Sequence, residues 1–154
     1  MRRIRANGAL THEIKNVHGT VHFVTWSDAS WANRKDMTST GGFLTGCCGD
    51  DVVSGQQGHI SVISWGGNKL KRIARNSLAA ELQALANAED ELHITRAAWA
   101  ELQGETLDLD NPSETVARIP GIVAIDAKSI YDTLTSANQP LQLSEKRPAL
   151  ELMA

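Results

Sequence analysis

The chain has 154 residues, of which 42% are hydrophobic and 21% charged, and this composition predicts one globular domain with its own core. Its net charge of −3 excludes binding to nucleic acid through overall charge alone. No run of about 18 apolar residues is present, and the N-terminus lacks the apolar centre of a secretory signal. We therefore expect an intracellular protein, cytoplasmic or nuclear, with no membrane partner.

Three segments in the first half have the pattern of β-strands. Residues 20–27 carry apolar side chains on both faces, as a central strand does. Residues 42–48 and 60–65 follow, and segments rich in Gly and Asp separate them. Because no helical pattern intervenes, the three segments predict an antiparallel meander.

A long helix is predicted from Ser77 onwards, where Ala, Leu, Glu and Gln dominate and apolar residues recur at helical spacing. Asn76 or Ser77 can cap this helix, which puts Glu81 in its first or second turn. The polar residues 104–118 end the helix and are expected to form a connection. A fourth strand, "IPGIVAID", then ends on Asp126.

The rest of the chain sets the domain boundaries that we expect. Residues 127–137 predict a short helix, and residues 143–154 begin another that has no stop signal. We expect a flexible N-terminal segment over residues 1–19. Residues 20–154 would then form one domain that is incomplete at its C-terminus.

Two of the predicted strands lead into a carboxylate, Asp28 after the first and Asp126 at the end of the fourth. The long helix before the fourth strand allows it to run parallel to the first. Because neighbouring strands lie about 4.8 Å apart, the two carboxylates would then be adjacent at one sheet edge. Glu81 could provide a third oxygen ligand. Such a set suits Mg²⁺ or Mn²⁺ and phosphodiester hydrolysis. The alternative, which the residues leave open, is that both Asp side chains cap turns or helices.

Three blocks of the sequence, in order, resemble one protein family. The blocks are "SDASWANRKDMTSTGGFLTG", "ISWGGNKLKRIARNSLAAELQAL" and "AIDAKSIYD". They resemble the ribonuclease H domain of copia-type retrotransposon polyproteins, where the matching blocks include Ser-Asp-Ala-Asp-Trp-Ala, Ile-Ser-Trp-Ser-Ser-Lys-Lys-Gln and Cys-Asp-Asn-Gln-Ser-Ala. The resemblance runs from about Val21 to the end of the chain. Three blocks in the right order are more specific than any one of them.

This resemblance implies a fold, a cofactor and a reaction. The fold is of the α/β class, a ribonuclease H-like mixed sheet of five strands flanked by helices, in which a three-stranded antiparallel meander is joined by a parallel fourth strand. Asp28, Glu81 and Asp126 would be the catalytic, metal-binding carboxylates and would hold two Mg²⁺ or Mn²⁺ ions. The reaction would be endonucleolytic cleavage of the RNA strand of RNA–DNA hybrids, beside an upstream reverse transcriptase domain of the same polyprotein.

The densest basic segment, "NKLKRIAR", contains Lys69, Lys71 and Arg72. By their position in the resemblance, these residues would approach the phosphates of the hybrid and add affinity without sequence preference. A solvated loop or helix start is the alternative interpretation of the same segment.

The chain departs from the family in two places. The family's Thr-Glu-Ala-Glu reads "LAAE" here, which keeps the second Glu as Glu81. The sequence stops at Ala154, before the family's last strand and fourth Asp, so we expect lower metal affinity and turnover than in a complete domain. Two alternatives therefore stay open: an inactive or truncated remnant that binds nucleic acid weakly at most, and a DNA-cutting nuclease of the integrase type.

Overall fold

A mixed four-stranded sheet forms the centre of the computed structural model, which describes residues 13–17, 19–108 and 110–135. The strand order is β3-β2-β1-β4, where β1 and β2 are antiparallel, β2 and β3 are antiparallel, and β1 and β4 are parallel. The strands are β1 (His22–Ser30), β2 (Thr40–Cys48), β3 (Ile60–Lys69) and β4 (Gly121–Ile125). The predicted meander with a parallel fourth strand is confirmed, and the described part of the chain holds four strands rather than five.

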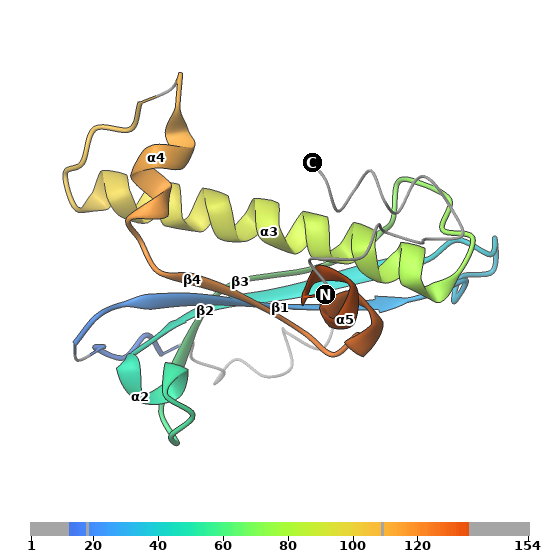
Figure 1. Cartoon of the computed structure of the whole chain (residues 1–154), viewed down its shortest axis with the longest axis horizontal. Helices are drawn as coiled ribbons and strands as arrows, with labels where there is room; N and C mark the ends of the chain where they lie inside the picture. Colours follow the sequence, from blue (N-terminus) through green and yellow to red (C-terminus); the bar gives the residue numbers. More distant parts are fainter. Residues whose placement is uncertain (1–12, 18, 109, 136–154) are drawn as a thin grey trace, which may run out of the picture.

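Helices cover one face of this sheet. The long helix α3 runs across it, with α4 at the far end of α3, whereas α2 projects on the opposite side (Figure 1). The helices are α2 (Asp50–Val53), α3 (Ser77–Leu102), α4 (Pro112–Ala117) and α5 (Lys128–Thr135). In the part of the chain that the structure describes, no helix has the length and apolar character that crossing a bilayer requires.

The core lies between α3 and the sheet. Phe23 of β1 packs with Leu92 and Ala100 of α3, and its ring meets that of Trp99 edge to face at a centroid distance of 5.7 Å. A second buried cluster, built mainly from small side chains, lies under the first turns of α3. Because Phe23 faces α3, the odd-numbered side chains of β1 point to the helix and the even-numbered ones point to the opposite face.

Three strands extend beyond the predicted segments, and β2 does so by beginning at Thr40 rather than at residue 42. β1 continues to Ser30, so Asp28 lies inside the strand rather than after it, and β3 continues through two glycines to Lys69. The extensions of β1 and β3 both pair with the start of β2. Asp28 of β1 pairs with Gly42 of β2, and Gly67 and Lys69 of β3 pair with Gly42 and Thr40 of β2. The ladder hydrogen bonds of β2 hold both extensions, although neither carries an apolar strand pattern.

One further prediction, that residues 104–118 form only a connection, is wrong. This segment contains α4, which has Pro112 at its start and buries Thr115 and Val116. Arg96 of α3 stabilises its end, because the guanidinium donates to the backbone oxygen of Val116 at 2.7 Å and to that of Ile119 at 2.8 Å. The helix predicted from residue 143 onwards lies outside the described residues.

Candidate metal centre

The sheet brings Asp28 and Asp126 together. The last pair of the parallel β1–β4 ladder is Ser27–Ile125, so the next residue on each strand is an aspartate. By the alternation of β1, Asp28 points to the side of the sheet away from α3, and Asp126 lies close to it just past the end of β4. The predicted adjacency of these two side chains at the carboxyl ends of parallel strands is therefore observed.

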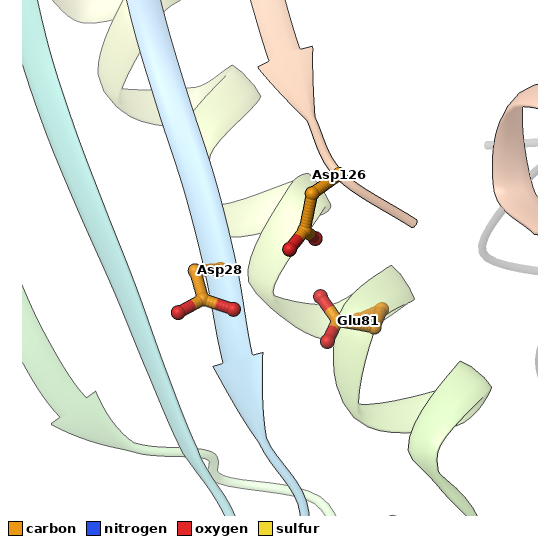
Figure 2. A group of neighbouring side chains, drawn as sticks. All are labelled: Asp28, Glu81 and Asp126. Atoms are coloured by element: carbon orange, nitrogen blue, oxygen red, sulfur yellow. The ribbon is translucent and has the colours of Figure 1, made fainter. Parts of the chain in front are cut away.

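The third carboxylate comes from α3. Asn76 caps the helix, since its Oδ1 accepts a hydrogen bond from the backbone N–H of Ala79 at 2.8 Å, and this fixes where the first turn begins. Glu81 lies in the following turn and points towards the two aspartates (Figure 2). One carboxylate oxygen from each of Asp28, Glu81 and Asp126 lies within 4.8 Å of the other two.

The three like charges affect one another. Burial of Glu81 against the sheet raises the pKa of its carboxyl, and the nearby charges of Asp28 and Asp126 raise it further. A hydrogen bond from the backbone N–H of Ala29 acts in the opposite direction and holds the carboxylate towards β1. A proton or a cation bound at the cluster would therefore stabilise it, because added positive charge reduces the repulsion between the carboxylates.

The donor set fits a hard divalent cation. Mg²⁺ and Mn²⁺ prefer carboxylate and water oxygens, and the cluster offers three carboxylates from three different elements. Asp28 and Asp126 are exposed, so further oxygens from water or from a ligand can reach the same point. The triad could thus hold a metal ion, although exposed acidic groups are also common without one.

The predicted phosphate-binding residues lie elsewhere. Lys69, Lys71 and Arg72 line a groove of about 780 Å³ between α3 and the β2–β3 part of the sheet, opposite Gln83 of α3. Because residues two apart on a helix point about 200° apart, Gln83 and Glu81 face different sides of α3. The structure therefore does not bring these basic residues into the carboxylate cluster itself.

One charged contact near this groove was not predicted. The Lys69 ammonium lies 2.7 Å from a carboxylate oxygen of Asp36, in the turn between β1 and β2. This hydrogen-bonded ammonium lowers the pKa of Asp36 well below its usual range, and the hydroxyl and backbone N–H of Thr38 add to the effect. The two residues are 33 positions apart, so no local sequence pattern could have indicated the pair.

Comparisons of the chain with protein-family models, with curated proteins and with solved structures found no match. The fold and the carboxylate geometry are thus the observations on which a function can be argued.

Proposed function

We propose that this chain is a metal-dependent ribonuclease H-type endonuclease domain that hydrolyses the RNA strand of RNA–DNA hybrids. The observation that carries the proposal is the convergence of Asp28, Glu81 and Asp126 from β1, α3 and the end of β4. These are the three residues that the sequence resemblance implies as metal-binding carboxylates, two from the parallel pair β1–β4 and one from α3. The strand order, with a meander and a parallel fourth strand, supports the same proposal.

The two aspartates and the glutamate would contribute to the chemistry in different ways. Asp28 and Asp126 are exposed and would bind a divalent cation from the solvent side, whereas Glu81 is half buried and oriented by Ala29. A bound Mg²⁺ would supply Lewis-acid chemistry, which lowers the pKa of a coordinated water and offsets charge on a phosphate. The carboxylates would hold that charge in place and accept hydrogen bonds from water.

The partners follow from this chemistry. The substrate would be an RNA–DNA hybrid, and selection of RNA would depend on contacts to its 2′-hydroxyls. Lys71 and Arg72, on the groove beside α3, and Lys69, at the end of β3 where the groove meets the sheet edge, would contact phosphates outside the reacting centre. In a retrotransposon-type polyprotein, an upstream reverse transcriptase domain would supply the hybrid, and the site of action would be intracellular.

The proposal is tested by cleavage of a labelled RNA–DNA hybrid in Mg²⁺, compared with duplex RNA and duplex DNA. We expect cutting of the hybrid's RNA strand, with a rate at least about a hundredfold lower in Asp126→Asn, the scale seen when one transition-state contact is removed. Asp110→Asn is the matched control, because Asp110 is an exposed aspartate between α3 and α4. Both variants should stay folded, since Asp126→Asn removes one of three like charges.

The other outcomes identify the alternatives. Equal rates in Asp126→Asn and wild type would mean that the triad is not the catalytic site. Cleavage of duplex DNA in preference to the hybrid would favour an integrase-type nuclease on this scaffold. No metal-dependent cleavage of any of the three substrates would favour an inactive remnant that keeps the fold.

A further inference from the structure

Two pairs of glycines lie opposite each other in the sheet. Gly41 and Gly42 open β2, Gly66 and Gly67 lie near the end of β3, and the ladder pairs Gly42 with Gly67. Glycine weakens a strand, because it loses more backbone freedom on folding and offers no side chain to pack. A structural or functional reason is therefore expected for glycine at each of these four strand positions.

Packing explains the two glycines on the α3 side. A Cβ on Gly41 would lie 2.7 Å from Cδ2 of Leu70 and 3.1 Å from Cβ of Ala84 in α3. A Cβ on Gly66 would lie 2.7 Å from Cε1 of Phe43, whose ring covers it. At both positions a side chain would displace these neighbours, so close packing favours glycine there.

Neither packing against the described residues nor backbone conformation explains the other two. A Cβ on Gly42 would have only the backbone oxygen of Gly66 nearby, at 3.5 Å, and one on Gly67 would meet no described atom within 4 Å. Neither residue has the left-handed φ that favours glycine, and Gly67 is exposed. Glycines of this kind mark places where a ligand or another backbone approaches the sheet closely.

These two glycines continue the row of the candidate metal centre. Asp28 pairs with Gly42 across β1 and β2, and Gly42 pairs with Gly67 across β2 and β3. Partners in register point to the same face, so the three positions form one line on the face away from α3. We call Gly42 and Gly67 the glycine strip, and it leads from the Asp28 carboxylate to the edge of the sheet.

The glycine strip lies between two sets of side chains. We call Arg34 and Lys69 the basic wall, and Leu44 and Trp65 the apolar wall. On one side, Thr40 pairs with Lys69, and Arg34 donates from Nε to the Thr40 hydroxyl at 3.1 Å, so two cations flank this threonine. On the other side Leu44 pairs with Trp65, whose side chain is 67% exposed. The two walls are four residues apart along the strands, or about 13 Å.

We propose that the glycine strip is the binding surface for the sugar–phosphate backbone of one nucleic-acid strand, which runs along the strip to the carboxylates. Its phosphates would face Arg34 and Lys69, of which Lys69 keeps donor hydrogens beyond the one given to Asp36. A sugar or base would face the Trp65 ring, a contact that tolerates any sequence. The inference rests on the proposed function, because the strand is the substrate of that reaction.

The proposal is tested with Gly67→Val, a change that adds a bulky side chain to the glycine strip. A β-branched residue suits a strand and has open space here, so the free energy of unfolding should stay equal or rise. Binding of a fluorescein-labelled RNA–DNA hybrid, measured by anisotropy in EDTA so that the carboxylates need no metal, should weaken about tenfold or more. Gly66→Ala is the matched control: it should lower stability while the folded molecules bind as wild type.

A second variant tests the basic wall. Arg34→Gln should reduce the slope of log affinity against log salt by about 1, because one phosphate contact is lost. Arg118→Gln, which changes an exposed arginine at the end of α4, should leave the slope unchanged.

Three results would overturn the inference: no binding of the hybrid by wild type, unchanged binding by Gly67→Val, or loss of folding in Gly67→Val, which would mean that the chain itself packs on the strip. The result for the proposed function is separate. If wild type binds the hybrid and Gly67→Val weakens that binding, the strip stands even where Mg²⁺ produces no cleavage.

Discussion

Two threonines in the sheet show how buried hydroxyls can pair with each other. Thr25 of β1 and Thr45 of β2 are fully buried, and their hydroxyl oxygens lie 2.9 Å apart. They are direct ladder partners, so each hydroxyl satisfies the other within the layer under α3. A buried hydroxyl without a partner costs about 1–3 kcal/mol.

Removal of one of these hydroxyls should therefore cost more than removal of both. We expect Thr25→Val to lower the free energy of unfolding by about 1–3 kcal/mol, because the Thr45 hydroxyl is left unpaired. The double variant with Thr45→Val should recover most of this loss. Urea denaturation of the two single variants and the double variant measures the coupling. Additive losses in the double variant would contradict the pairing.

At the scale of elements, the turn between β1 and β2 is held by contacts to β3. Ala32 and Met37 adopt left-handed backbone conformations, with φ of 48° and 58°, and reverse the chain there. The Asp36 carboxylate then contacts the Lys69 ammonium at the last residue of β3. This contact joins the turn to the edge strand, and it holds Lys69 beside the glycine strip.

The contribution of this ion pair should depend on pH. The pKa of Asp36 is lower in the folded state than in the unfolded chain, so the contact stabilises the protein above the ordinary pKa of an aspartate, near 4. That contribution is lost as the pH falls from this value towards the folded pKa. Wild type should thus be more stable than Asp36→Asn at neutral pH, and the difference should vanish at the acid end of a urea-denaturation series. A difference that is independent of pH would exclude the charge as its cause.

At the scale of the whole molecule, the carboxylate cluster joins elements from distant parts of the chain. The first strand, the start of α3 and the end of β4 each provide one carboxylate. An unfolded chain does not hold these groups together, so a cation that needs all three binds only the folded state. Metal binding is then linked to folding.

Mg²⁺ should therefore raise the thermal stability of the whole domain. At a free concentration about a hundred times the Kd, the expected gain is about 2.7 kcal/mol. Thermal unfolding at constant ionic strength, with NaCl replacing MgCl₂ in the reference, isolates the specific effect. Asp126→Asn should lose most of this gain and Asp110→Asn should keep it. An equal gain in both variants would assign the effect to a site other than the triad.

Local patterns predicted much of the fold and the members of the candidate site. Short apolar runs bounded by turn residues identified the cores of the strands, and helical spacing with the Asn76 cap identified α3. The patterns failed where stability comes from partners. β3 continues through Gly66 and Gly67 because β2 pairs with it, and α4 forms in a polar segment because α3 supplies Arg96 to its last carbonyls.

The sequence by itself indicated which segments form the four strands and the long helix α3, since side-chain periodicity depends on residues close together in the chain. The sequence also indicated Asp28, Glu81 and Asp126 as candidate ligands. Because it contains 18 acidic residues, it could not show that these three lie together. The tertiary structure decided that these three meet, because the β1–β4 register and the position of α3 are set by packing between distant segments. It also decided that Gly42 and Gly67 face the same side as Asp28, a relation that exists only across paired strands.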